Sequence, residues 1–102
     1  MSLKLRILAK DGNIITATSQ TEELLAVLLD VKQGLFSLDN DEEETLRGWL
    51  LVRADQLENG TTVTVAGDNS ICIGKSVDGR AFVRDARGDW PPLKPDFGKN
   101  PF

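Results

Sequence analysis

The segment SQTEELLAVLLDVKQG, residues 19–34, most constrains how this chain can fold. Ser19 followed three residues later by Glu22 forms a capping box, which predicts a helix start, and Gly34 provides a natural stop. Between them, residues 24–29 are all apolar. A helix with almost no polar face in its middle has to be buried on more than one side. We therefore expect it to pack against a sheet on one side and against another helix or a partner chain on the other.

Residues 3–18, ahead of this helix, have the pattern of a β-hairpin. Apolar and charged residues alternate with a period of two, which is typical of a half-buried strand. Asp11-Gly12 suits a tight two-residue turn. In that register Ile7 pairs with Thr16 on one face of the hairpin.

Residues 38–60 predict a second helix, which we place at 40–58. A helical stripe of apolar residues runs through Leu46, Trp49, Leu50, Ala54 and Leu57. Asp39 and Asp41 are candidate caps, and Gly60 would end the helix. The alternative of a buried strand at 49–52 stays open, because Gly48 costs a helix about 1 kcal/mol relative to alanine.

Residues 39–44, DNDEEE, carry five carboxylates within six positions and raise the question of a metal site. An EF-hand loop that began at Asp39 would need glycine at position 44 and glutamate at position 50, where Glu44 and Leu50 stand. The EF-hand interpretation therefore fails. We expect a charged, solvated helix start, and mimicry of nucleic-acid phosphate is the alternative.

The chain after the second helix predicts three antiparallel strands. TTVTV and SICIG flank a three-residue loop at 67–69, in a register that pairs Val65 with Ile71. RAFVRD follows a turn at 77–79 and forms the third strand. A bulge at Gly74 would be needed to turn the apolar residues of this strand toward the core. The fold class is therefore α+β: an N-terminal β-hairpin, two helices and a C-terminal antiparallel β-meander of about three strands.

Residues 86–102, ARGDWPPLKPDFGKNPF, predict an extended C-terminal arm outside a single domain at residues 1–85. The arm holds all four prolines of the chain, which favour a stiff, extended backbone. It also holds Trp90, Phe97 and Phe102, each of which can bury some 150–250 Å². We expect these three aromatic residues to bind a surface, either on their own domain or on a partner chain.

Composition argues against several function classes. The net charge is −4 and residues 20–60 carry ten acidic side chains against three basic ones, which disfavours a general nucleic-acid binder. There is no histidine and no tyrosine, and Cys72, the one cysteine, lies in a predicted strand with no nearby base. We expect no catalytic residue, cofactor or metal. With no hydrophobic leader and no possible internal disulfide, we expect a cytoplasmic protein.

These observations favour a small, acidic, non-enzymatic protein-interaction or regulatory module. Its protein partner is unidentified, and it would bind through the arm or self-associate as a dimer through the apolar helix or the arm. The alternative is a nucleic-acid-associated protein that binds single strands with charged and aromatic residues of the last sheet: Arg80, Phe82, Arg84, Arg87 and Trp90. A small enzyme is the third class.

Overall fold

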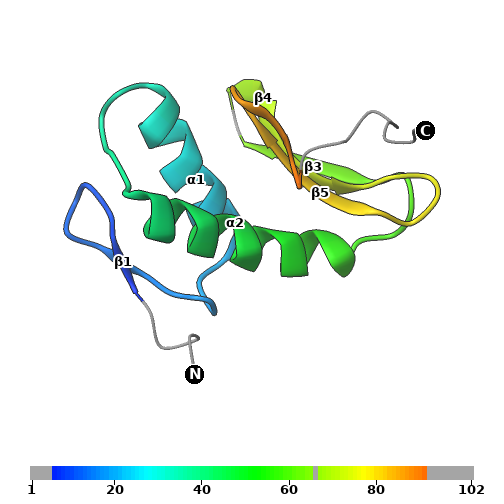
Figure 1. The fold of residues 1–102 in the computed structure, drawn as a ribbon, viewed down its shortest axis with the longest axis horizontal. Helices are drawn as coiled ribbons and strands as arrows, with labels where there is room; N and C mark the ends of the chain where they lie inside the picture. Colours follow the sequence, from blue (N-terminus) through cyan, green and yellow to red (C-terminus); the bar gives the residue numbers. More distant parts are fainter. Residues whose placement is uncertain (1–5, 66, 92–102) are drawn as a thin grey trace, which may run out of the picture.

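The computed structural model describes residues 6–65 and 67–91. Phe97 and Phe102, two of the predicted binding residues, lie outside the described part of the chain. The elements, in chain order, are β1 (Ile7–Leu8), β2 (Ile14–Ile15), α1 (Thr21–Lys32), α2 (Asn40–Asp55), β3 (Thr62–Val65), β4 (Asp68–Lys75), β5 (Ala81–Asp85) and β6 (Gly88–Trp90). The predicted α+β class is confirmed: a hairpin and two helices precede an antiparallel meander in the order β3-β4-β5-β6 (Figure 1).

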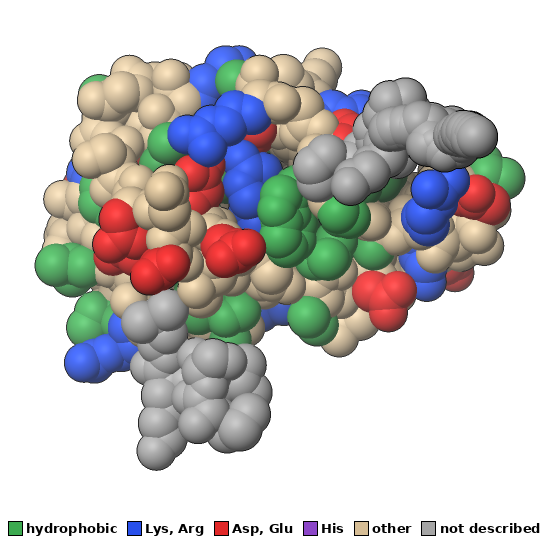
Figure 2. All heavy atoms as spheres, in the orientation of Figure 1, with side chains coloured by type: hydrophobic (Ala, Val, Ile, Leu, Met, Phe, Trp, Pro, Cys, Tyr) green, Lys and Arg blue, Asp and Glu red, His purple; other side chains and the backbone are tan. Residues whose placement is uncertain are grey.

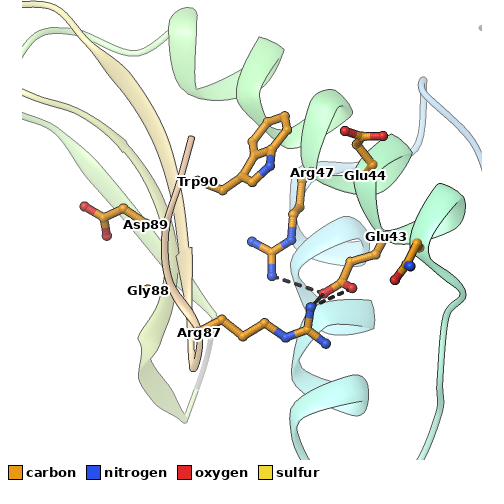
Figure 3. A pocket seen from close by; sticks show the side chains of 8 residues that line it. Glu43, Glu44, Arg47, Arg87, Gly88, Asp89 and Trp90 are labelled. Carbon is orange, nitrogen blue, oxygen red and sulfur yellow. Dashed lines mark hydrogen bonds and ion pairs between the residues drawn. The ribbon is translucent and has the colours of Figure 1, made fainter. Parts of the chain in front are cut away.

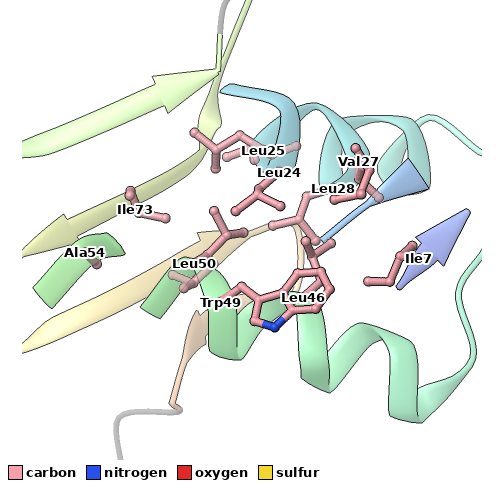
Figure 4. Close-up of a cluster of buried hydrophobic side chains, with 13 residues drawn as sticks. Ile7, Leu24, Leu25, Val27, Leu28, Leu46, Trp49, Leu50, Ala54 and Ile73 are labelled. Carbon is pink, nitrogen blue, oxygen red and sulfur yellow. The ribbon is translucent and has the colours of Figure 1, made fainter. Parts of the chain in front are cut away.

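The two helices lie between the β1–β2 hairpin and one face of the four-stranded sheet (Figure 1). The hydrophobic core joins all three layers (Figure 4) and includes Ile7, Ile15, Leu24, Leu25, Leu28, Leu46, Leu50, Ile71, Ile73 and Val83. Four apolar side chains of α1 are thus buried within their own domain, namely Leu24, Leu25, Val27 and Leu28. Leu29 and Val31 are half-buried, and Ala26 is exposed. No helix in residues 6–65 and 67–91 has the length and apolar character needed to cross a membrane.

Helix α1 begins one residue later than predicted. The backbone N–H of Gln20 donates to the Glu23 carboxylate at 3.1 Å, whereas the Ser19 hydroxyl accepts from the Thr16 N–H at 2.9 Å. Ser19 closes the preceding turn instead of capping the helix, so the Ser19–Glu22 capping box is wrong by one residue. The predicted stop is confirmed, because Gly34 has a φ of 77° directly after the last turn.

Helix α2 confirms the helical interpretation over the buried strand. Asp39 caps it, with its carboxylate accepting from the Glu42 N–H at 2.8 Å while the Glu42 carboxylate accepts from the Asp39 N–H at 3.0 Å. The helix ends at Asp55, three residues before the predicted end at 58. The Lys75 ammonium donates to the Asp55 carbonyl at 3.0 Å, and Gly60 lies in the turn that leads into β3. A side chain from the sheet therefore satisfies this end of the helix, and Gly60 does not end it.

The β1–β2 hairpin is paired one residue out of the predicted register. Ile7 lies opposite Ile15, and the Ala9 N–H donates to the Asn13 carbonyl at 2.7 Å. The loop therefore has three residues, 10–12, with a φ of 80° at Gly12, which matches the common three-residue hairpin. An odd loop places Ile7 and Ile15 together on the buried face, so the predicted pairing of Ile7 with Thr16 is wrong.

The β3–β4 pairing is confirmed in its middle and wrong at the turn. Val63 lies opposite Ile73, as that register requires, but Val65 lies opposite Asp68 instead of Ile71. The shift follows an irregularity between Thr64 and Val65. At its new position the Asp68 carboxylate accepts from the Lys32 ammonium of α1 at 2.6 Å.

The Asp68 carboxylate provides a test of that contact. The Lys32 ammonium, followed by the Ser70 hydroxyl and N–H, lowers the pKa of Asp68 from 3.8 to about 2. Because the folded-state pKa lies below the unfolded one, the contribution to stability is present above pH 3.8 and is lost as the pH falls toward 2. An NMR titration of Lys32→Met should show a higher Asp68 pKa than in the wild-type chain, since only the Ser70 bonds remain. An unchanged midpoint would mean that Lys32 does not stabilise the carboxylate.

The β4–β5 turn sets the register of β5 without a bulge. Ile73 lies opposite Val83 and the Ser76 N–H donates to the Arg80 carbonyl at 2.9 Å, which leaves a three-residue loop at 77–79. This loop length alone turns Val83 and Ala81 toward the core. The predicted bulge at Gly74 is therefore wrong, although the predicted face of β5 is confirmed.

Gly74 has a packing role instead. A Cβ at this position would lie 2.5 Å from Cζ of Phe82 and 2.7 Å from Cγ2 of Thr62. We expect Gly74→Ala to lower the free energy of unfolding by about 1–3 kcal/mol in urea denaturation, because the Phe82 ring would have to move to make room for the new Cβ. In a Phe82→Ala background the same substitution should lower the free energy of unfolding by clearly less. Equal losses in the two backgrounds would contradict this account.

Candidate interaction site

Trp90, the one aromatic residue of the predicted arm within the described chain, lies on β6 opposite Val83. Its side chain is half-buried, packs against the core and lies beside Arg47 of α2 (Figure 3). Residues 88–90 form the fourth strand, so the start of the predicted arm belongs to the sheet. Whether Trp90 also binds a partner stays a prediction.

Arg84 lies on the opposite face of the sheet from Trp90. Its guanidinium lies 5.0 Å from the centroid of the Phe82 ring and pairs with the Asp89 carboxylate at 2.7 Å. Strand alternation places Phe82, Arg84 and Asp89 on the face that the helices do not cover, whereas Trp90 faces α2. The structure therefore does not bring Arg84 and Trp90 together.

The other two arginines of the predicted binding set, Arg80 and Arg87, lie apart from both Arg84 and Trp90. Arg80 lies in the β4–β5 turn and pairs with Asp78 at 3.3 Å. Arg87 lies in the β5–β6 turn and pairs with the Glu43 carboxylate at 2.7 Å. The predicted set is thus spread over two faces and two turns of the sheet.

A cluster of four charged residues joins α2 to the β5–β6 hairpin: Glu43, Arg47, Asp85 and Arg87. Figure 3 shows Glu43, Arg47 and Arg87. Arg47 is 5% exposed, donates to the Glu43 carboxylate at 3.2 Å, and also pairs with Asp85 of β5. Glu43 is 7% exposed, so the prediction of a solvated helix start is wrong for this residue. A sequence signal existed: Glu43 precedes Leu46 by three residues and Arg47 by four, which places it beside the core stripe with a partner one turn on. Asp85 gave no such local signal.

Two adjoining pockets follow one side of α2. One, of about 340 Å³, is lined by Glu44, Arg47 and Trp90 among others. The next, of about 300 Å³, is lined by Gly48, Leu51, Val52, Asp55 and Ala81. Glu44 and Gly48 are one helical turn apart on the same side of α2, so the pockets succeed each other along the helix. We name this surface the α2 groove; it is lined by Glu44, Arg47, Gly48, Leu51, Val52, Asp55, Ala81 and Trp90.

The middle of the α2 groove is apolar and its ends are acidic. Val52 is 59% exposed, Leu51 and Trp90 are half-buried, and a Cβ on Gly48 would meet nothing within 4 Å. Glu44 is exposed at one end, and at the other the Asp55 side chain is 72% exposed. Figure 2 shows hydrophobic side chains gathered in the middle of the face that α2 crosses, with acidic side chains on either side.

Gly48 offers a direct test of this open surface. We expect Gly48→Ala to raise the free energy of unfolding by about 1 kcal/mol, because alanine is the better helix former and the space around a Cβ is open. Thermal or urea unfolding measures the change. A loss of stability would show that the groove at Gly48 is filled.

The described residues contain no group of three or more histidine, cysteine, aspartate or glutamate side chains placed to hold a metal ion. Cys72 is buried, and this burial raises the pKa of its thiol, which disfavours the reactive thiolate. Comparison of the chain with protein-family models, with curated proteins and with solved structures finds no match.

Proposed function

We propose that this protein is a non-enzymatic protein-interaction module that binds a segment of its partner in the α2 groove. The observation that supports this most is the apolar strip of Gly48, Leu51 and Val52, which lines a pocket together with Ala81. Val52 is 59% exposed in the last turn of a helix whose opposite side is core. A partly open, concave apolar surface with a polar rim is typical of a docking site for a side chain.

The charges around the groove favour a partner with basic residues. Arg47 is neutralised by Glu43 and Asp85, and Arg53 donates to the Ala17 carbonyl at 2.8 Å on the hairpin side. At the ends of the groove, Glu44 is exposed and has no ion pair among the described residues, whereas Asp55 shares its charge with the Lys75 ammonium at 3.6 Å. We propose a partner segment with an apolar side chain flanked by lysine or arginine, because opposite charges steer association and fix register.

The other functions have less support. Each of Arg80, Arg84 and Arg87 pairs with a carboxylate, and Trp90 faces away from Arg84, so a combined stacking and phosphate surface does not form. Self-association through α1 would need an exposed apolar face. Instead, its large apolar residues Leu24, Leu25, Val27 and Leu28 are buried in their own core.

A peptide library displayed on phage and selected on the immobilised full chain tests the proposal. The selected peptides should share an apolar residue flanked by basic ones. Fluorescence anisotropy should show that Val52→Asp weakens their binding at least tenfold. Leu8→Asp is the matched control, since Leu8 is also 59% exposed but lies on β1, and it should leave the affinity unchanged. Failure to select any peptide, or equal affinities for Val52→Asp and the wild-type chain, would refute the proposal.

A further inference from the structure

We infer that two copies of this chain form a dimer in which their β3 strands pair antiparallel, edge to edge. β3 is the first strand in the sheet order β3-β4-β5-β6, and no strand of residues 6–65 and 67–91 lies on its other side. The α2 groove lies beside β5 and β6, toward the opposite edge of the sheet, so the dimer is independent of the proposed function. Three features support it: the backbone groups of β3, the exposure of its valines and the symmetry of its sequence.

The backbone groups of two β3 residues face away from β4. The Lys75 N–H donates to the Thr61 carbonyl at 2.9 Å, so Thr61 is a hydrogen-bonded position of the ladder. Hydrogen-bonded and non-hydrogen-bonded positions alternate along an antiparallel strand. Val63 therefore also bonds to β4, whereas the N–H and carbonyl groups of Thr62 and Thr64 point outward. These two threonines present two donors and two acceptors to an incoming strand.

The core face is incompletely covered along the same edge. Val63 and Val65 pack against the core but are only half-buried. Ile73 and Val83, which continue the row of Val63 across the next two strands, are 1% and 0% exposed. The difference arises because β4 and β5 have a neighbouring strand on both sides and β3 has one on a single side. One more strand beside β3 would cover the two valines, and burial of their apolar surface favours its addition.

The β3 edge also lacks the features that prevent strands from pairing. Residues 61–65, TTVTV, contain no charged residue and no proline, which are the residues that proteins use to block an open edge. The other edge of the sheet has both. β6 is only three residues long, carries Asp89, and is followed directly by Pro91. The sheet is therefore protected at β6 and open to pairing at β3.

The sequence of β3 is its own complement about Val63, which selects a second copy as the occupant. In an antiparallel pair centred on this residue, Val63 lies opposite Val63 of the second copy, and Thr62 lies opposite its Thr64. Both threonine pairs are then at hydrogen-bonding positions, so four N–H···O bonds form and valine meets valine on the core face. Centring on either threonine would place the other one opposite a residue outside β3. A twofold dimer requires such a self-complementary surface.

The dimer should be weak, because the pairing of two four-residue strands buries little surface. Small interfaces form transient complexes, so we expect a dissociation constant between about 10 μM and about 1 mM. Sedimentation equilibrium of the full-length chain should show an average mass that rises from one chain toward two over this range. Thr64→Pro should weaken the dimer roughly tenfold or more, because it removes an N–H that only the second copy uses. A wild-type chain that stays monomeric at the top of the range would overturn the inference.

Cysteine cross-linking tests the register. Val63→Cys places two thiols opposite one another at a non-hydrogen-bonded position, where Cα atoms are about 4.5 Å apart, a separation that a disulfide can span. Mild oxidation should therefore link most of this variant into dimers. Val65→Cys is the matched control, since Val65 is on the same face of β3 and is also half-buried but would lie opposite Thr61 of the second copy. It should stay largely unlinked.

Equal cross-linking of the two cysteine variants, or none in either while circular dichroism shows both to be folded, would contradict the dimer. If one of them fails to fold, sedimentation of the wild-type chain still decides. A monomeric wild-type chain in which the selected peptides shift the Thr62 and Thr64 amide signals would assign the β3 edge to a partner strand and also overturn the dimer. The proposed function is tested separately, because Thr64→Pro should leave peptide binding in the α2 groove unchanged.

Discussion

Arg47→Ala should lower the free energy of unfolding by about 3–5 kcal/mol. The guanidinium is the shared partner of Glu43 and Asp85, whose side chains are each only 10% exposed. Its removal leaves two carboxylates near one another in a poorly hydrated site, and breaking a buried pair from one side is costly for that reason. Urea denaturation with linear extrapolation measures the loss.

The matched control is Arg87→Ala, which removes a guanidinium from the same cluster. The Arg87 side chain is 68% exposed, so water can replace its contact with Glu43 and the expected loss is at most about 1 kcal/mol. Similar losses for the two variants would contradict the distinction between a buried and an exposed partner. A large effect at Arg47 would also show that the wall of the α2 groove is held in place by charge as well as by packing.

Leu50→Ala should lower the free energy of unfolding by about 2–5 kcal/mol. Leu50 is fully buried on the core side of α2, where its removal leaves a cavity between both helices and the sheet (Figure 4). The loss combines the transfer free energy of the missing atoms with the cost of that cavity. Thermal and urea unfolding should agree, as they do for a small two-state domain.

Leu35→Ala is the control of the same chemistry, because Leu35 is 53% exposed in the loop between α1 and α2. Its removal should change stability by no more than about 0.5 kcal/mol. If Leu35→Ala were as costly as Leu50→Ala, the boundary between core and surface around α2 would be wrong. The pair also separates the core side of α2 from the groove side, on which the proposed function depends.

Local signals in the sequence predicted the elements well and their ends less well. Asp39 with Glu42 caps α2, and Gly34 follows the end of α1, because such bonds form within one turn of the chain. At Ser19 two nearby donors compete for one hydroxyl, and the Thr16 N–H takes it. At the end of α2 the Asp55 carbonyl accepts from Lys75, twenty residues away, a contact that no local signal marks.

Local sequence rules were also insufficient to predict which residues of neighbouring strands lie opposite one another. The number of residues in a hairpin loop decides which side chains share a face, and Asp11-Gly12 is compatible with loops of two or three residues. Only burial against α1 and α2 favours the register in which Ile7 and Ile15 point inward together. The same holds at Asp68, where the bond to Lys32 joins segments 36 residues apart.

The sequence by itself determined the fold class of this protein. Apolar residues that recur every two or every 3.6 residues, together with helix caps and turn residues, specify a hairpin, two helices and an antiparallel meander. The tertiary structure alone decided which distant partners the buried charges meet and which surface is open. Asp85 meets Arg47, and Trp90 turns toward α2 beside Arg47, only once the sheet has packed on the helices. The physical reason is that hydrogen bonding and hydrophobic periodicity act along the chain, whereas burial of a charge or a groove depends on residues that are distant in it.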